Sequence, residues 1–266
     1  MPKIISVANQ KGGVGKTTTS VNLAASLALA GKEILLIDMD PQANASSNLG
    51  FKLTVQDNSI YEVLTSQCHI DEAIFNFAST DIQNLRILPS KEKLAAIEVE
   101  LVEDLSLEER PFLLKEKLDD LKELENLNNF DYIFIDCPPS LGQLTINALC
   151  AADTVLIPVQ AEYFALEGLS RLIETVEKVK DQWNQHLEYE GILLCMTDDR
   201  TNLSKEVSEE IKSYFGSKVY SVSIPRNVRV AESPSYGKPV ILYSAVSRGA
   251  YAYINLADDF LERNEE

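Results

Sequence analysis

The sequence predicts an α/β fold in which helices flank a doubly wound, mostly parallel sheet. Three observations lead to this prediction. A short β-branched run at residues 4–9 is followed by a glycine-rich segment and then by an alanine- and leucine-rich run, residues 18–30, that stops before Gly31. Two later apolar runs, residues 34–37 and 132–135, are each followed directly by aspartate. Short apolar strands that alternate with helices are typical of parallel sheets, because both faces of such sheets are buried.

The composition predicts one cytoplasmic domain over residues 1–266. A chain of this length buries about three-quarters of its unfolded surface, and no linker-like or repetitive segment divides it. The first three residues lead directly into a strand, so we expect no signal peptide. No apolar run approaches the roughly 18 residues that span a bilayer. The four cysteines are scattered and are expected to be free thiols: Cys68, Cys137, Cys150 and Cys195.

The net charge of −17 argues at first sight against a nucleic-acid partner. Much of this charge is local, because residues 98–125 are rich in Asp and Glu. Within that segment Leu114, Leu118, Leu121 and Leu124 recur at helical spacing, which predicts a solvated helix with one buried stripe. Charges are screened over about 8 Å at physiological salt. A basic patch elsewhere on the chain can therefore still bind DNA.

The segment at residues 11–18 has the composition and context of a phosphate-binding loop. Successive backbone N–H groups of such a loop turn toward an anion, and the following helix adds positive charge. Lys16 is expected to contact the β- and γ-phosphates, and the Thr17 hydroxyl to hold Mg²⁺. This context predicts the fold of a P-loop nucleoside triphosphatase. The predicted nucleotide ligands of the loop are Lys11, Gly12, Gly13, Val14, Gly15, Lys16, Thr17 and Thr18.

The loop departs from the usual pattern at its start. The pattern G-x-x-x-x-G-K-[ST] requires glycine where this chain has Gln10, and a second lysine follows at Lys11. Lys11 can add charge to the nucleotide of its own chain, or it can reach the phosphates of a partner chain as an arginine finger does. Geometry read from one sequence leaves both roles open.

Carboxylates follow two of the predicted strands. Asp38 and Asp40 come after residues 34–37, at a position where an attacking water or Mg²⁺ needs to be organised. An Asp-Pro pair also commonly marks a turn, but two aspartates directly after an apolar strand favour the functional interpretation. Asp136 ends the run at residues 132–135 in the Walker B form, which predicts contact with Mg²⁺ through water.

The base preference follows from a missing motif. A GTPase of this general class carries [NT]-K-x-D after a late strand. Residues 197–200 of this chain read Thr-Asp-Asp-Arg after an apolar run and lack that lysine. The sequence therefore favours ATP over GTP.

Taken together, these motifs resemble the ParA/Soj family, within the ParA/MinD group of ATPases that have a deviant Walker A loop. Residues 11–18, 38–44 and 134–140 stand in ParA-like order and spacing, and residues 196–204 and 224–240 are also similar. The similarity covers essentially the whole chain. One departure is Ala43, where many members have glycine.

The resemblance implies an ATPase that partitions chromosomes or plasmids. ATP and Mg²⁺ would close a homodimer that binds double-stranded DNA without sequence preference, and a ParB-like centromere-binding protein would stimulate hydrolysis. Lys11 and Lys16 would act with Asp40, which orients the attacking water. Such a protein is cytoplasmic and nucleoid-associated. Carried over by position, Pro225 and Asn227 line the adenine, and Arg200 and Arg229 hold DNA.

Several alternatives remain beside this interpretation. A MinD-like positioning ATPase shares the phosphate loop, but it should end in a basic amphipathic helix, whereas residues 253–266 are acidic. We therefore expect no membrane partner. A relative of the nitrogenase iron protein would need paired cysteines, and none is recognisable. A ParA-like positioner of a protein cargo and a nucleotide-dependent scaffold without hydrolysis are further alternatives.

Overall fold

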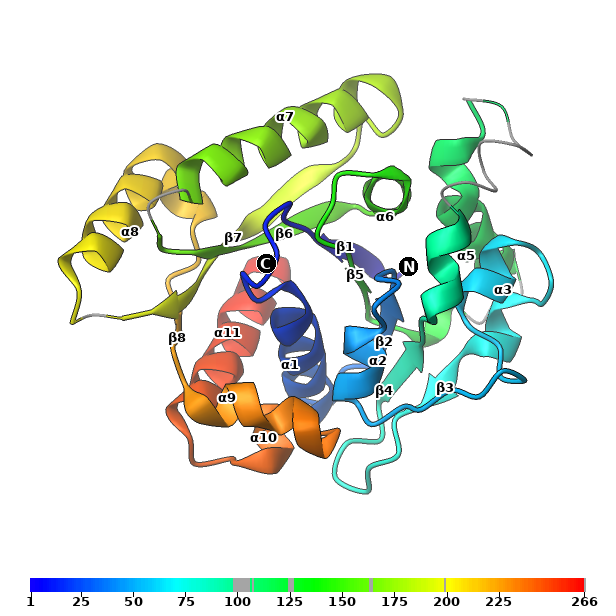
Figure 1. Cartoon of the computed structure of the whole chain (residues 1–266), viewed down its shortest axis with the longest axis horizontal. Coiled ribbons are helices and arrows are strands. Elements are labelled where there is room, and N and C mark those ends of the chain that lie inside the picture. The colour runs from blue at the N-terminus through cyan, green and yellow to red at the C-terminus, as the bar shows by residue number, and fades with distance from the viewer. Residues whose placement is uncertain (98–105, 107, 124–126, 163–164, 199, 266) are drawn as a thin grey trace.

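The predicted α/β fold is confirmed by a computed structural model, which describes residues 1–97, 106, 108–123, 127–162, 165–198 and 200–265 (Figure 1). The described residues form an eight-stranded sheet in the order β3-β4-β2-β5-β1-β6-β7-β8. Among the described strands β3 alone runs antiparallel to its neighbour. The strands are β1 (Lys3–Val7), β2 (Ile34–Asp38), β3 (Phe75–Asn76), β4 (Leu85–Leu88), β5 (Tyr132–Asp136), β6 (Thr154–Gln160), β7 (Glu188–Thr197) and β8 (Ile224–Pro225).

Helices cover both faces of the sheet, each over its own hydrophobic core (Figure 1). One face packs against α1 (Lys16–Leu29), α10 (Val240–Tyr243) and α11 (Arg248–Asn264). The other face packs against α3 (Ile60–Leu64), α5 (Leu113–Glu123), α6 (Gln143–Ala151), α7 (Ala165–Gln182) and α8 (Asn202–Phe215). Two further short helices, α2 (Asn44–Asn48) and α9 (Val228–Glu232), complete the described α-helices.

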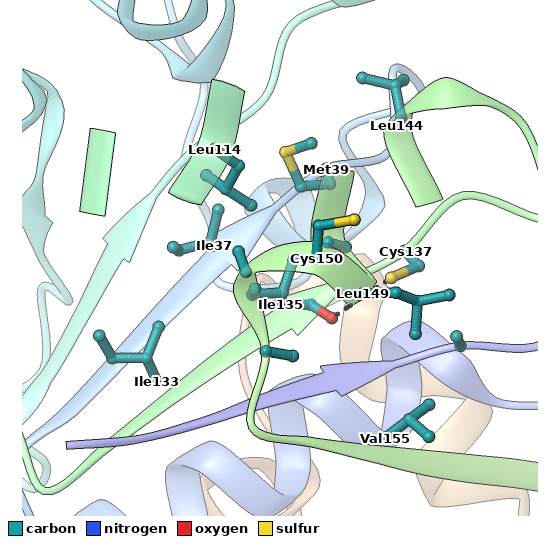
Figure 2. Close-up of a cluster of buried hydrophobic side chains, with 14 of the residues drawn as sticks. Ile37, Met39, Leu114, Ile133, Ile135, Cys137, Leu144, Leu149, Cys150 and Val155 are labelled. Atoms are coloured by element: carbon teal, nitrogen blue, oxygen red, sulfur yellow. Dashed lines mark hydrogen bonds between the residues drawn. The ribbon is translucent and has the colours of Figure 1, made fainter. Parts of the chain in front are cut away.

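The predicted leucine stripe is confirmed where the structure describes it. Leu114, Leu118 and Leu121 of α5 are buried, whereas Leu124 lies outside the described residues. Figure 2 shows Leu114 among strand and helix side chains of the same core, such as Ile37 and Ile135. The packing of α5 against this core covers part of one face of the sheet, and the strands of that sheet carry the site.

The order of the strands determines where a ligand can bind. The first strand, β1, lies in the middle of the sheet between β5 and β6. The chain therefore winds outward in both directions from β1, which is the defining property of a doubly wound sheet. In such folds ligands bind at the carboxyl ends of the strands, where the winding direction changes.

Two simpler predictions can also be compared with the structure. All four cysteines are free thiols, as predicted. None of the described helices has the length and apolar character that are needed to cross a membrane.

Candidate nucleotide-binding site

The carboxyl ends of β2, β5 and β1 lie side by side and carry the three predicted motifs. In the parallel registers Asp136 stands opposite both Val7 and Asp38. The glycine-rich loop follows β1, and Asp40 lies two residues beyond the end of β2. Motifs more than 100 residues apart in the sequence therefore meet at one edge of the sheet.

The glycine-rich loop ends in the first turn of α1. Gly13 and Gly15 have positive φ angles of 76° and 100°, a conformation that glycine adopts without steric penalty. The helix begins at Lys16, two residues earlier than predicted, and ends at Leu29. Gly31, with φ 91°, ends the helical region as expected. The unpaired N–H groups of the first helical turn are therefore available to an anion at the loop.

The Lys16 side chain is buried but is not committed to a carboxylate. Its Nζ donates to the backbone oxygen of Lys11 at 3.2 Å, and none of the ion pairs between described residues includes it. Burial lowers the pKa of Lys16, although the nearby charge of Asp136 opposes this shift. A desolvated ammonium group with one backbone acceptor is well suited to bind a phosphate.

Asp136 is fully buried, and one of its two carboxylate oxygens has no partner. Oδ1 accepts a hydrogen bond from the Ser20 hydroxyl at 2.8 Å, whereas Oδ2 has none. Burial, together with the neighbouring Asp38, raises the pKa of Asp136. An unpartnered carboxylate oxygen beside the Thr17 hydroxyl fits a hard divalent cation, because Mg²⁺ takes one or two carboxylates, hydroxyls, phosphates and water.

The described residues contain no cluster of three or more His, Cys, Asp and Glu side chains that could hold a metal ion alone. Ser20, which orients Asp136, was missed by the sequence analysis. It lies one helical turn after Lys16 and was indistinguishable there from other polar residues of α1.

The two aspartates after β2 have different surroundings. Asp38 is fully buried and accepts hydrogen bonds from the backbone N–H and hydroxyl of Ser46 at 2.8 and 2.7 Å. It also accepts from the Asp40 backbone N–H at 3.2 Å. Asp40 instead borders the cavity described below, and one oxygen accepts from the Gln42 backbone N–H at 2.9 Å. Asp38 therefore shapes the loop, while Asp40 faces the site.

Ala43 adopts a left-handed conformation. Its φ of 51° and ψ of 37° place it just before α2, at the helix N-cap. A side chain with a Cβ atom is disfavoured there by roughly 1–2 kcal/mol. This conformation gives a physical reason for the glycine that the resemblance leads one to expect at this position.

A cavity of about 450 Å³ joins the phosphate loop to the β8–α9 segment. It brings together the predicted residues Lys16, Asp40, Pro225 and Asn227. Val14 is buried and does not border this cavity. Asn227 also caps α9, since its Oδ1 accepts from two backbone N–H groups of that helix. Further lining residues, which the sequence analysis did not assign, are Asn44, Asn48, Pro139, Cys195, Met196, Ile224, Arg226, Val230, Ala231, Pro234 and Tyr253.

Asn44 and Asn48 illustrate what a sequence signal can reveal at such a site. They lie four residues apart on α2 and therefore on one face of the helix. Two asparagines with this spacing, just after an aspartate motif, form the sequence pattern that could have indicated these cavity residues. Tyr253 lies more than 200 residues from the loop in the sequence, so no local sequence pattern indicates that it borders the cavity.

Lys11 lies at the rim of the site. Its Nζ forms an ion pair with Glu162 Oε2 at 2.8 Å, and both side chains are partly exposed. Lys11 does not border the cavity, although its backbone oxygen accepts the Lys16 hydrogen bond. Glu162, which follows β6, was not singled out by the sequence analysis.

Arg200 and Arg229 lie outside the cavity, on the exposed surface around β7 and α9. The Arg200 side chain is 87% exposed and forms an ion pair with Asp198 at 2.7 Å. The Arg229 side chain is 56% exposed and forms an ion pair with Glu232 at 2.9 Å. Both arginines are thus accessible, as a surface contact with another molecule requires.

The loop, Lys16, the buried Asp136 and the cavity-lining Asp40 on a doubly wound sheet define a P-loop nucleoside triphosphatase. A family model described as an AAA domain matches residues 2–189. The sporulation initiation inhibitor protein Soj of Bacillus subtilis is 52% identical over 259 residues, which cover 97% of this chain and 98% of that protein. The chain belongs to the Soj/ParA family of chromosome-partitioning ATPases.

Solved structures support the same class. Cobyrinic acid a,c-diamide synthase from Mycobacterium smegmatis, with bound ADP and magnesium, has a TM-score of 0.83 at 32% identity and covers 100% of this chain and 96% of its own. A putative plasmid partition protein from Borrelia burgdorferi, bound to AMPPNP, has a TM-score of 0.82 at 29% identity over 99% of this chain and 100% of its own. Both structural alignments span nearly the entire chain, from the phosphate loop to α11.

Proposed function

We propose that this ATPase uses ATP and Mg²⁺ to close a homodimer that binds DNA without sequence preference and releases it after hydrolysis. The observation that carries the proposal is a cavity-lining Lys16 that is bound to no carboxylate of the described residues, with the buried Asp136 and its unpartnered oxygen nearby. The similar proteins crystallised with ADP and magnesium or with AMPPNP support the choice of ligand. The proposed location is the cytoplasm, on the nucleoid.

Each residue of the site has a proposed part in ATP hydrolysis. The loop N–H groups and Lys16 bind the phosphates, while Thr17 and Asp136 hold the cation, the latter through water. Bound Mg²⁺ supplies positive charge at the β- and γ-phosphates. Asp40, whose carboxylate faces the cavity, orients the attacking water. Pro225 and Asn227, at the far side of the cavity, contact the adenine.

The position of Lys11 supports a role across the dimer. Its amine does not border the cavity of its own chain and forms a partly exposed ion pair with Glu162, where a second molecule can reach it. Lys11→Ala should bind ATP as a monomer but fail to dimerise. Light scattering with a non-hydrolysable ATP analogue tests this, with Lys115→Ala on α5 as the control that dimerises like the wild type. Normal dimerisation of Lys11→Ala would contradict the cross-subunit role.

DNA binding is the second testable part of the proposal. Arg200 and Arg229 are both exposed, and a dimer presents each of them twice. Affinity should be independent of sequence and should fall with a slope of about −0.9 in log K per log salt for each phosphate contacted. Arg200→Glu and Arg229→Glu should abolish ATP-dependent DNA binding and leave the dimer intact.

Mobility-shift titrations at two salt concentrations, with and without ATP, measure this effect. Lys115→Glu on α5, at the opposite end of the sheet from β8, is the charge-matched control (Figure 1). Equal DNA binding by the wild type and both arginine reversals would contradict the proposed surface.

A ParB-like centromere-binding protein is the proposed stimulator of hydrolysis. Phosphate release by the ATP-bound dimer should rise when such a protein and DNA are added together. The membrane-bound alternative has less support, because the apolar side of α11 is buried against the sheet at Leu256 and Phe260. No stimulation by the ParB-like protein from the same genome would contradict the proposed partner.

A further inference from the structure

Both arginines proposed to bind DNA are already bound to carboxylates of their own chain. Arg200 donates through Nε and Nη2 to the two oxygens of Asp198, at 2.8 and 2.7 Å. Two parallel hydrogen bonds of this kind are also the geometry with which arginine binds a phosphate. Asp198 therefore occupies the Nε/Nη2 edge of the guanidinium group, one of the two edges with which it can bind a DNA phosphate through paired hydrogen bonds.

Arg229 is engaged in a comparable way. Its Nη1 donates to Glu232 Oε2 at 2.9 Å. The same oxygen accepts from the Tyr243 hydroxyl at 3.2 Å, and the Tyr243 ring stacks on Tyr236 with centroids 4.7 Å apart. Glu232 is thus held in place by a tyrosine from another helix, which keeps its carboxylate beside Arg229.

We propose that Asp198 and Glu232 compete with DNA phosphates for Arg200 and Arg229 and thereby limit the DNA affinity of this ATPase. The inference rests on the proposed DNA binding and specifies how that surface is regulated. Each arginine exchanges an internal carboxylate for a phosphate when DNA binds. Without DNA, both arginines are therefore already neutralised by carboxylates. A single protomer gains little binding free energy when it exchanges these carboxylates for phosphates. A dimer makes twice as many phosphate contacts and has the advantage of joint binding.

The expected effect of removing one competitor is moderate. An exposed ion pair changes an equilibrium constant by at most about fivefold, and each ATP-bound dimer contains two copies of every pair. Glu232→Gln and Asp198→Asn should each tighten DNA binding by about three- to tenfold. Both substitutions keep the size of the side chain and remove only its charge.

The controls separate local competition from a general change in charge. Glu116→Gln removes one negative charge from the exposed face of α5, where none of the ion pairs between described residues includes Glu116. It should leave the affinity unchanged, because charges beyond about 8 Å are screened. In an Arg229→Ala background, Glu232→Gln should no longer tighten binding, because the competition it relieves has been removed.

Fluorescence anisotropy of a random-sequence duplex, titrated with each dimer in a non-hydrolysable ATP analogue, tests the inference. Light scattering verifies that every variant dimerises. Tighter binding by Glu232→Gln and Asp198→Asn, without change in Glu116→Gln, supports competition. Wild-type affinity in both variants, or an equal gain in Glu116→Gln, overturns it. A wild-type dimer that does not bind DNA at all contradicts the proposed function instead.

Discussion

Each end of the parallel strands contains a buried carboxylate, and the two carboxylates differ in how fully they are paired. We call the amino ends of the strands the amino edge and their carboxyl ends the carboxyl edge. At the amino edge, Glu190 of β7 is 2% exposed in its side chain and forms an ion pair with Lys3 at 2.6 Å. It also accepts hydrogen bonds from Thr154, Tyr220 and Asn264 at 2.8, 3.2 and 2.8 Å. Burial raises the pKa of Glu190, but these donors, led by Lys3, outweigh burial and hold it below its usual value.

At the carboxyl edge, Asp136 Oδ1 accepts a hydrogen bond from Ser20 and Oδ2 has no hydrogen-bond partner among the described residues, while the nearby Thr17 hydroxyl and Lys16 charge only partly offset the cost of burial. Burial and Asp38 raise its pKa. A buried charge that lacks partners destabilises the fold, whereas a fully paired one is compatible with it. The carboxylate at the amino edge is therefore fully satisfied by its own chain, whereas the one at the carboxyl edge lacks partners that a cation and phosphates would supply.

The largest expected effect comes from the lysines beside these carboxylates. Lys16→Ala should weaken ATP binding by about a hundredfold or more, because it leaves buried phosphate charge without its cation. Lys3→Ala is the matched variant at the amino edge, and it should reduce stability while ATP affinity stays normal. Titration with a fluorescent ATP analogue, with urea unfolding in parallel, measures both. Loss of ATP binding in both variants would remove the distinction between the edges.

A somewhat smaller effect is expected at Asp40. Asp40→Ala should lower ATP turnover about a hundredfold, because positioned acid–base groups contribute at this level. ATP binding should persist, and the dimer should accumulate because the step that resets it is lost. Phosphate-release kinetics and light scattering check these two results. Wild-type turnover in Asp40→Ala would assign the role to Asp38 or another group.

Glu190→Gln sharpens the contrast through pH. Because the folded-state pKa of Glu190 is lowered, its ionised form stabilises the protein above the ordinary glutamate value of about 4.3. This contribution is lost as pH falls through the lower folded-state pKa. The variant should be less stable than the wild type by about 1–3 kcal/mol at pH 7.

The difference between the variant and the wild type should shrink below about pH 4. Urea unfolding of both proteins at several pH values measures it, and Glu174→Gln on the exposed face of α7 serves as the control. A difference that stays constant with pH would show that ionised Glu190 is not the stabilising species.

The smallest expected effect is at Ala43 in the loop of the carboxyl edge. Ala43→Gly should raise the free energy of unfolding by about 0.5–1 kcal/mol, because glycine adopts the left-handed conformation without strain. Urea unfolding of the nucleotide-free protein measures the change. Ala45→Gly in the buried, right-handed part of α2 is the opposing control and should destabilise. A destabilised Ala43→Gly would contradict the strain at this position.

Much of the carboxyl edge could be predicted from the sequence, because its motifs are local. Residues 11–18 and the aspartates after β2 and β5 lie next to apolar strands, and parallel pairing brings the ends of those strands together. Lys16 and Asp40 line one cavity together with Pro225 and Asn227, which only the family resemblance had indicated. The helix after the loop was predicted two residues too late, because the first turn of α1 has the polar composition of a loop.

The amino edge could not be predicted, because its contacts join distant parts of the chain. Glu190 and Asn264 are 74 residues apart in the sequence, and the alternation Glu-Tyr-Glu at the start of β7 resembles a half-exposed strand. The pair Lys11–Glu162 spans 151 residues and was missed for the same reason. The strain at Ala43 depends on backbone angles that composition does not reveal.

The most direct test of the contrast is thermal unfolding of Asp136→Asn and Glu190→Gln, each with and without a non-hydrolysable ATP analogue and Mg²⁺. A ligand that binds the folded state raises the melting temperature. Asp136→Asn should melt no lower than the wild type without ligand, because burial already disfavours the charged form of Asp136 and the amide keeps the size of the side chain, and it should lose the rise on adding ligand. Glu190→Gln should melt lower without ligand and keep the full rise. A lower melting temperature in nucleotide-free Asp136→Asn, together with a normal rise, would contradict the account.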